Sequence, residues 1–521
     1  MPLELIREAI KVNQVIAKDS AQTIVENDII VPDTKPDISQ ILLFDGDAVV
    51  TNTEISGNKA VIYGIAVYKI LYVSDDPEQT VKSINTNANF THELDIEEVG
   101  ENSKCKANCD IEHIDYNILN GRKVNVKAVI KSDYKLTSEG EQEIVSDLSG
   151  IEDVQILRNN ANINCYIGAN DTDYTIAEAL EIPTGKPSVV EILRNDIKIS
   201  GKDYKVTENK VVVKGELNVA TLYIADDETR SIQTMEHEIP FTQFVDLYGA
   251  HESASCDIDY RVVNSSFEVA EDSDGELRVV NSEINLAISV EGYEKKNIEV
   301  IDDAYSPRIN LILDKEAFRM EEPVTESRSQ IILKDTIAIN EGSPDISEVF
   351  NVLCKPSLSE YRIAEDKVVV EGAVNNNVLY LAGSSEQPVC CHQQEIPFKQ
   401  YIDAKGVKPE MLCEISLYID HCNYSMVSAN EVEIRLVIGV NLKLINQSMI
   451  PLIVKAEDTP ADEKRLASQP SITIYFSQPG DTLWKVAKRY YTTVEDIKRV
   501  NGLVDRETLV VGQQVIIPRR L

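Results

Sequence analysis

The side chains best suited to metal chemistry are cysteines and histidines four residues apart. Cys105, Cys109 and His113 follow one another at this spacing, in a stretch of strand-like composition. On an unbroken strand, residues four apart point to the same face, so these three side chains would line up as zinc ligands do. A tetrahedral zinc site needs a fourth ligand, and none is evident, so buried thiols are the preferred interpretation. The same interpretation holds for a second cluster, which comprises Cys413, His421 and Cys422.

Paired carboxylates could serve in acid–base catalysis or bind calcium. With 87 acidic residues among 521, however, such pairs are expected in solvated turns, and no twelve-residue calcium loop is present. The chain also lacks a phosphate-binding loop, a His-Glu-x-x-His zinc motif and the Gly-x-Ser-x-Gly elbow of a serine nucleophile. We therefore predict a protein that is not an enzyme and that uses no cofactor and no metal. The pairs considered are Asp75-Asp76, Asp226-Asp227 and Asp302-Asp303.

The strongest candidates for binding a partner lie in the last fifty residues. Trp484 is the single tryptophan, and it follows Leu483 on a predicted helix. If Leu483 faces the core, Trp484 is turned about 100° away from it. Its ring then either folds over the edge of a small domain or forms an exposed anchor, since tryptophan is enriched at interface hot spots. The second alternative predicts a partner-binding face made of Trp484, Lys485, Lys488, Ile472 and Ile474.

Two helices between two strands are predicted to position these residues. The first helix carries an apolar stripe at helical spacing, with Asp481 as its expected N-cap. Thr492 and Glu495 form a capping-box pattern for the second helix, which Asn501-Gly502 is expected to end in a left-handed conformation. The β-branched runs at 472–476 and 515–517 indicate the strands. The stripe of the first helix comprises Leu483, Val486, Ala487 and Tyr490.

In order and spacing, these motifs make residues 472–519 resemble the LysM domain, a β-α-α-β module. Tyr491 departs from the family, which usually has a glycine there. The resemblance implies binding either to N-acetylglucosamine polymers or to another protein. In the first case, two loops would line a sugar groove, the second of them running from Asn501 to Leu509. The groove residues that the resemblance implies are Gly480, Asp481, Thr482, Leu483, Asn501 and Gly502.

A second strong pattern is an internal triplication at separations of 151 and 157 residues. Four independent landmarks share this register. They are a proline in a turn, a glycine after a valine-rich run with a tyrosine eight residues on, a phenylalanine, and a cysteine. The equivalent residues are Pro36, Pro187 and Pro344; Gly64, Gly215 and Gly372, with Tyr72, Tyr223 and Tyr380; Phe90, Phe241 and Phe398; and Cys105, Cys256 and Cys413.

The repeats have strand rather than helix periodicity. The glycine lies inside a strand pattern, which suggests a β-bulge or a close backbone approach. We therefore predict a mainly β protein of three repeated β-rich domains, followed by a small C-terminal α+β domain. The predicted segments are a leader at 1–20, repeats at 21–160, 161–314 and 325–454, a charged connector at 315–323, a solvated linker at 455–471 and the LysM-like domain at 472–519.

Three such repeats followed by a LysM domain resemble the SipL-like morphogenetic proteins of the bacterial spore coat, which contain SPOCS domains. The resemblance implies an assembly adaptor that binds SpoIVA, a morphogenetic ATPase, and so tethers the coat to the forespore in the mother-cell cytoplasm. Further coat proteins are additional candidate partners. The alternative is a carbohydrate-binding protein of the spore cortex or wall, for which peptidoglycan is the less favoured ligand.

Composition favours the adaptor. A net charge of −36 argues against nucleic acid, because phosphate binding needs clustered lysine and arginine. The charge is uneven, since residues 471–521 carry +3 and the first 470 carry −39. No apolar run approaches the roughly 20 residues that span a bilayer, so no membrane insertion is expected. The start lacks the form of a secretory signal, and nine cysteines without a Cys-x-x-Cys motif favour reduced thiols and a cytoplasmic location.

Overall fold

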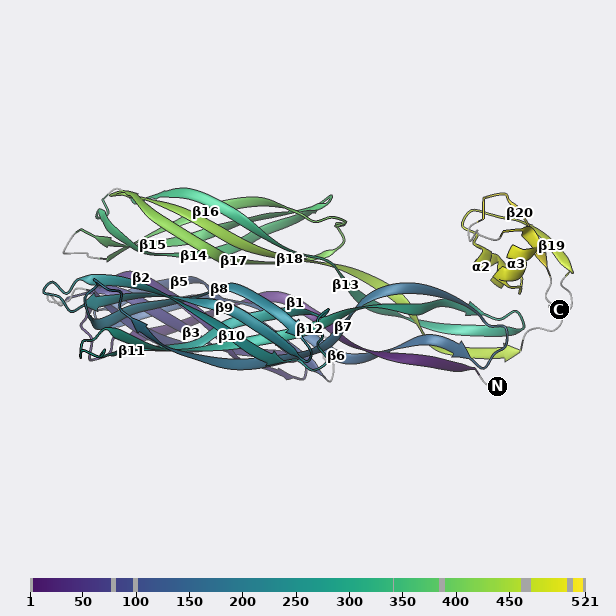
Figure 1. The fold of residues 1–521 in the computed structure, drawn as a ribbon, viewed down its shortest axis with the longest axis horizontal. Coiled ribbons are helices and arrows are strands. Elements are labelled where there is room, and N and C mark those ends of the chain that lie inside the picture. Colours follow the sequence, from purple (N-terminus) through teal and green to yellow (C-terminus); the bar gives the residue numbers. More distant parts are fainter. Residues whose placement is uncertain are drawn as a thin grey trace.

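A computed structural model of the chain describes residues 3–75, 81–96, 102–340, 342–383, 389–460, 470–503 and 509–518. It contains three six-stranded units of identical topology and a small α+β module (Figure 1). The predicted fold class, mainly β with a C-terminal βααβ domain, is confirmed. None of the helices within these ranges is long and apolar enough to cross a bilayer.

Each unit consists of two three-stranded antiparallel sheets that enclose one apolar core. In the first unit the sheet orders are β1-β6-β5 and β2-β3-β4, and the other two units repeat them. The strands of the first unit are β1 (Glu4–Ile30), β2 (Ile38–Ser56), β3 (Lys59–Ser74), β4 (Val81–Asp95), β5 (Ser103–Asn120) and β6 (Lys123–Ser149). Those of the second are β7 (Gln155–Glu181), β8 (Val189–Thr207), β9 (Lys210–Ala225), β10 (Ile232–Asp246), β11 (Ser255–Ala270) and β12 (Val279–Tyr305). Those of the third are β13 (Ile309–Ala338), β14 (Ile346–Ala364), β15 (Lys367–Ala382), β16 (Val389–Asp403), β17 (Leu412–Ser428) and β18 (Glu431–Pro460).

The repeated glycine and phenylalanine are direct cross-strand partners. Gly64 lies opposite Phe90, and the same pairing recurs in the other two units. A methyl group added at Gly64 would come within 2.2 Å of the Phe90 ring, so only glycine leaves room for it. The neighbouring strand β2 has a register shift between Val50 and Asn52, beside Gly64. The expected close approach is therefore confirmed, and the bulge lies on the strand next to the glycine.

The repeated tyrosine ties the central strand of one sheet to the proline turn. The Tyr72 hydroxyl donates to the Pro36 carbonyl at 3.0 Å, and Tyr223 donates to Pro187 at 3.2 Å. Both rings are fully buried. A buried hydroxyl needs such a partner, so in the first two units the shared register of proline and tyrosine follows from one hydrogen bond. In the third unit the Tyr380 hydroxyl bonds the side chains of Cys390 and Ser343 instead.

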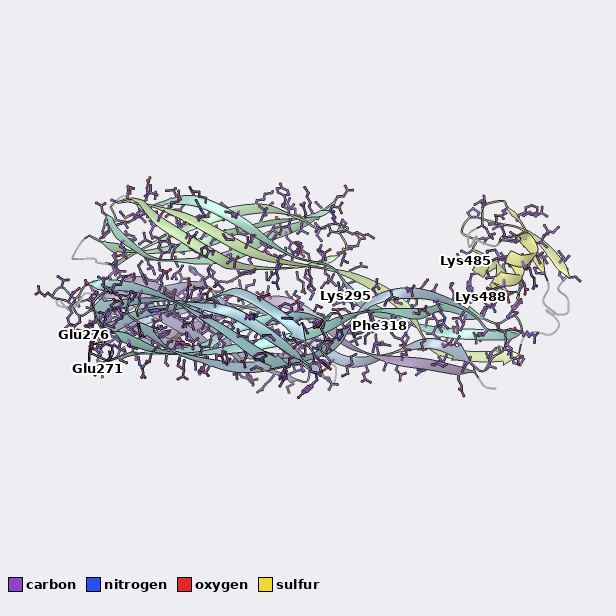
Figure 2. The ribbon with its side chains drawn as sticks, viewed as in Figure 1. Glu271, Glu276, Lys295, Phe318, Lys485 and Lys488 are labelled. Carbon is purple, nitrogen blue, oxygen red and sulfur yellow. The ribbon has the colours of Figure 1, made fainter. Side chains whose placement is uncertain are left out.

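The first and last strands of each unit are much longer than its sandwich. In Figure 1 the ends of β1, β6, β7, β12, β13 and β18 continue past the sandwiches as one extension, which we call the shaft. Lys295 and Phe318 lie near its beginning, and Glu271 and Glu276 lie at the opposite end of the molecule (Figure 2). Residues from all three units pack inside the shaft, among them Leu148, Ile301 and Ile453. The units therefore form one body.

Four of the predicted segments differ from the structure because their residues belong to strands of the shaft. Most of the predicted leader at 1–20 belongs to β1, which pairs with β6 from Glu4 onward. The boundary at 160 falls inside β7, the connector at 315–323 lies within β13, and residues 455–460 of the predicted linker belong to β18. Each strand pair buries only one face in the narrow shaft, so its composition is as polar as that of a linker. Residues 461–469 lie outside the described ranges.

Three equivalent positions join the sandwiches through charge pairs. Lys106 of the first unit pairs with Glu291 of the second at 3.4 Å. The residues equivalent to Lys106 are Asp257, which pairs with Lys443 of the third unit at 2.8 Å, and Glu414, which pairs with Lys18 of the first at 2.5 Å. Because the sign of the charge differs among the three positions, the three interfaces are not interchangeable. The three pairs join the first unit to the second, the second to the third and the third to the first, and they favour this arrangement over one with two units exchanged.

An apolar cluster from all three units, which we call the hub, lies between the sandwiches. Equivalent leucines from the central strands, Leu71, Leu222 and Leu379, are at its centre and are almost completely buried. No single unit could bury these side chains alone. The buried members of the hub are Leu43, Leu71, Val81, Leu193, Leu222, Ile224, Phe350, Leu379 and Val389.

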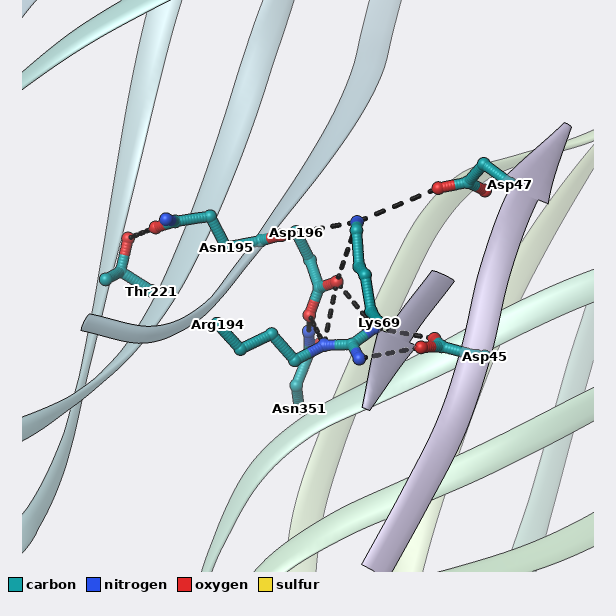
Figure 3. Close-up of polar contacts among 8 residues, drawn as sticks. All are labelled: Asp45, Asp47, Lys69, Arg194, Asn195, Asp196, Thr221 and Asn351. Atoms are coloured by element: carbon teal, nitrogen blue, oxygen red, sulfur yellow. Dashed lines mark hydrogen bonds and ion pairs between the residues drawn. The ribbon is translucent and has the colours of Figure 1, made fainter. Parts of the chain in front are cut away.

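A buried arginine links the three units beside the hub (Figure 3). Arg194 donates two hydrogen bonds to Asp45 of the first unit, at 2.8 and 2.6 Å, and its Nε donates to Asp196 at 2.8 Å. Asn351 of the third unit donates to the same Asp196 carboxylate at 3.4 Å. Burial alone would lower the pKa of Arg194, but the charges of Asp196 and Asp45 raise it above its ordinary value.

Candidate binding module and its contact with the shaft

The C-terminal module is built as the sequence predicts, from β19 (Ile472–Phe476), α2 (Leu483–Arg489), α3 (Val494–Asn501) and β20 (Gln514–Pro518). The apolar stripe of α2 faces inward, and Leu483, Val486 and Ala487 are buried. They pack with Ile497, Val515 and Ile517 of the other elements. The β-α-α-β arrangement is confirmed.

Both helix caps lie one residue later than predicted. Thr482, not Asp481, caps α2, because its hydroxyl accepts from the Lys485 N–H at 3.2 Å. Thr493, not Thr492, caps α3 and accepts from the Asp496 N–H at 3.1 Å. In each case two adjacent polar residues offered a cap, and the register of the buried stripe selected the second.

The predicted left-handed stop is confirmed, and a second left-handed residue explains the departure from the LysM pattern. Gly502 caps α3 with a φ of 63°. Tyr491, where LysM domains usually have glycine, has a φ of 55°. A side chain at such a φ strains the backbone, which glycine would avoid.

The predicted sugar-groove residues have structural partners inside the module. Asp481 accepts from the Tyr475 hydroxyl at 2.5 Å and from the Gln478 N–H at 2.7 Å. The Asn501 side-chain amide donates to the Ile516 carbonyl at 2.6 Å, and its oxygen accepts from the Ile516 N–H at 2.7 Å. These two bonds join α3 to β20. The Gly480 carbonyl accepts from Lys485, Thr482 caps α2, Leu483 is core and Gly502 is a cap. Residues 504–508 of the second groove loop lie outside the described ranges, so the sugar groove stays a prediction.

Trp484 contacts the end of the shaft. Its ring packs edge-on against Tyr305, the last residue of β12, with ring centroids 4.9 Å apart. Its Nε1 donates to the Asp303 carboxylate at 2.9 Å, and Lys488 bonds both oxygens of that carboxylate, at 2.6 and 2.8 Å. The Tyr305 hydroxyl donates to the Thr492 carbonyl at 2.8 Å. The Trp484 ring is therefore partly buried in this arrangement and is not the exposed anchor of the second alternative. Independent mobility of the module stays a prediction.

These contacts come from a part of the chain that sequence analysis treated as a solvated acidic pair. Asp302-Asp303 lies some 180 residues before α2, and only its place at the shaft tip brings Asp303 to Lys488. Burial alone would raise the pKa of Asp303. Hydrogen bonds from Lys488 and Trp484 and the Lys488 charge outweigh burial, so this pKa is lowered below its ordinary value.

The remaining predicted partner residues divide into two groups. Lys485 lies with Lys488 on the module (Figure 2), and its side chain is exposed. Ile472 and Ile474 are 62% and 58% exposed, and Phe476, which sequence analysis missed, is 60% exposed. These three alternate along β19 and point away from the module core, and Ile516 lies directly across from Ile474. We call these four residues, Ile472, Ile474, Phe476 and Ile516, the apolar face. The sequence pattern that could have predicted it is a short strand with large apolar residues on both of its faces.

The structure separates the side chains of the first predicted thiol cluster. A register shift between Ile111 and His113 breaks the alternation of β5, so His113 turns outward and pairs with Asp115 at 2.9 Å. Cys109 stays in the core beside the Ser132 hydroxyl. The expectation that Cys105, Cys109 and His113 share one face is therefore wrong. Within the described ranges, no three His, Cys, Asp or Glu side chains gather to hold a metal ion.

Releasing the module from the shaft is expected to change the fluorescence of Trp484, which is the only tryptophan. Asp303→Asn removes the acceptor of the Lys488 ion pair, so we expect the Trp484 emission to shift to the red as the ring becomes hydrated. Lowering the pH should also shift the Trp484 emission to the red, because it protonates the Asp303 carboxylate. The pKa of Asp303 is lowered in the docked state, so its contribution is complete above about pH 4 and is lost as the pH falls through the docked pKa.

Asp302→Asn is the matched control, because this neighbouring carboxylate has no described bond to the module. Its emission should equal that of the wild type, and circular dichroism should show both variants folded. An unchanged emission maximum in Asp303→Asn would contradict the docked arrangement.

Comparison with known families agrees with this architecture. The model described as "SipL, SPOCS domain" matches three times, at residues 37–119, 188–270 and 345–427, and the LysM domain model matches residues 478–518. The three SPOCS matches are offset by the same 151 and 157 residues as the landmarks and cover the second to fifth strands of each unit. The shaft strands lie largely outside them. No curated protein and no solved structure matches the chain.

Proposed function

Since the chain is a SipL-like protein with three SPOCS domains and a C-terminal LysM domain, we propose that it is a non-enzymatic adaptor of spore coat assembly. The domain combination fits a protein related to the sporulation coat that carries a LysM binding module. In this proposal the module binds the morphogenetic ATPase SpoIVA. The protein would thereby tether coat material to the forespore surface from the mother-cell side.

The observation that carries this proposal is the apolar face. Large apolar patches left open to water mark interaction sites, and the apolar face has three residues each more than half exposed on one short strand. A glycan would need polar groups and aromatic faces, and these four residues offer none of the former. An apolar strip of another protein fits the apolar face better.

Trp484 and Lys488 take a positioning role in this proposal. Their bonds to Asp303 and Tyr305 hold α2 against the shaft. The apolar face belongs to the sheet, on the side away from the helices, so docking leaves it open. Lys485 stays exposed, and the net positive charge of the module would favour an approaching acidic surface.

The test compares two ligands with the full-length protein. We expect saturable binding to purified SpoIVA in a biosensor measurement, and no sedimentation with insoluble chitin or peptidoglycan. Sedimentation that soluble chitooligosaccharides compete away, together with no binding to SpoIVA, would overturn the adaptor proposal and favour the carbohydrate-binding alternative.

A further inference from the structure

Two cysteines of the third unit face each other at the margin of its core. Cys354 lies on β14 and Cys422 on β17, which belong to different sheets, and their sulfur atoms are 3.5 Å apart. Both side chains are only partly buried, so a small reagent can reach them. A disulfide has a sulfur–sulfur distance of about 2.05 Å, so closure needs an approach of roughly 1.5 Å, within the range of side-chain rotation.

The architecture of the repeat does not require this pair. The positions equivalent to Cys354 and Cys422 are Ile197 and Ser265 in the second unit, and Gly46 and Ile114 in the first. Both of those units form the same sandwich without a thiol at either position. The pair is therefore an addition to the third unit.

The surroundings distinguish the two thiols. The two sulfur atoms are within hydrogen-bond distance, and either thiol can donate to the other. A bond accepted from Cys354 lowers the pKa of Cys422, against the effect of burial and with help from the nearby Lys198 amine. The same bond and burial raise the pKa of Cys354. Lys198 comes from β8 of the second unit and is itself largely buried, which lowers its pKa. Cys422 is thus the better nucleophile, and Cys354 is placed to react with its oxidised form.

We propose that Cys354 and Cys422 are a redox-active dithiol that a peroxide converts into a disulfide linking the two sheets of the third unit. The Cys422 thiolate attacks one oxygen of hydrogen peroxide, breaking the O–O bond to give a sulfenic acid and hydroxide. The Cys354 sulfur then attacks the Cys422 sulfur and expels the second oxygen as water. The proton from each thiol ends on an oxygen, so two thiols and one peroxide give one disulfide and two waters.

Metal binding is a weaker explanation of the same pair. Two thiolates alone do not complete a zinc site, and the described residues supply no third His, Cys, Asp or Glu side chain to form one. The Val352 backbone carbonyl lies near both sulfur atoms. Its oxygen is a hard ligand, which does not suit the metals that thiolates prefer.

The disulfide would close a loop of 68 residues between β14 and β17. A cross-link of this kind restricts the unfolded chain and so stabilises the folded unit. The sandwich of the third unit would become the most resistant of the three. Lys198 reaches this pair from the second unit. Oxidation of the two thiols would therefore also change the charge interactions at the interface between the second and third units.

The experiment treats the reduced full-length protein with stoichiometric hydrogen peroxide and maps its peptides by mass spectrometry. We expect one disulfide-linked peptide pair containing Cys354 and Cys422, which dithiothreitol separates, and a rise in Tm on the order of 5 °C for the oxidised protein. Cys413→Ser, on the same strand as Cys422, is the matched control and should oxidise like the wild type.

Two single variants separate the roles of the thiols. Cys354→Ser should leave a Cys422 sulfenic acid that dimedone traps, because the second sulfur is missing. Cys422→Ser should leave Cys354 several-fold less reactive than Cys422 is in the wild type. The proposal is overturned if peroxide leaves both thiols free in the wild type, or if other cysteines form the first disulfide. A dimedone adduct on Cys354 rather than Cys422 would also overturn it.

Discussion

Replacing Ile474 by glutamate is expected to weaken binding to SpoIVA at least thirtyfold while leaving the protein folded. Ile474 is at the middle of the apolar face and is 58% exposed, so a charge there costs the free protein little. In a complex the same charge would be buried against an apolar surface. Loss of an interface hot spot commonly costs about 2 kcal/mol or more, which corresponds to this factor in Kd.

The control for this prediction is Ile332→Glu. Ile332 is an isoleucine of β13 that is 70% exposed, and it lies on a sandwich far from the module. It should bind SpoIVA as the wild type does. The Trp484 emission of both variants should match the wild type, since neither change touches the contact with the shaft. Wild-type affinity in Ile474→Glu would place the partner surface elsewhere on the module.

The second large effect is expected at Arg194. Arg194→Ala removes the guanidinium that joins Asp45 of the first unit to Asp196 of the second, and it leaves two partly buried carboxylates close to each other. Breaking one partner out of a buried ion pair typically costs about 3–5 kcal/mol. We expect a clear fall in Tm, with the hub between the units opening first, as amide hydrogen exchange in β3 and β9 would reveal.

Lys59→Ala provides the comparison. Lys59 and Glu93 form an ion pair at 2.8 Å, as close as the pairs of Arg194, but both side chains are more than half exposed. Surface pairs contribute about 0–1 kcal/mol, so this variant should melt almost as the wild type does. Arg194→Lys should fall between the two, because an ammonium cannot bond both carboxylates in the fork geometry. Equal Tm values for Arg194→Ala and Lys59→Ala would show that the units do not depend on this contact.

Local patterns were enough to predict the module and the repeats. The stripe of α2, the glycine at 502 and the strand at 472–476 each follow from residues within a few positions of one another. The triplicated glycine, phenylalanine and tyrosine could be recognised from spacing alone, because each unit makes the same cross-strand contact and buries the same tyrosine ring. The caps were displaced by one residue where two polar neighbours competed.

The domain boundaries could not be predicted in the same way. Residues 315–323 and 455–460 look like linkers because strand pairs with one buried face in a shaft are as polar as solvated segments. Likewise, the four-residue spacing of Cys105, Cys109 and His113 predicted a shared face, and a single register shift in β5 separated them. Periodicity is reliable only while the strand stays regular.

The amino-acid sequence by itself determined the three β-rich repeats and the LysM module, because these depend on residue types at short range. Only the tertiary structure decided how the parts meet. Trp484 could be either a packed ring or an exposed anchor until Asp303 and Tyr305, about 180 residues earlier, were placed beside it. The facing thiols of Cys354 and Cys422 were equally hidden, since strand pairing and sheet packing bring together residues that no short-range pattern connects.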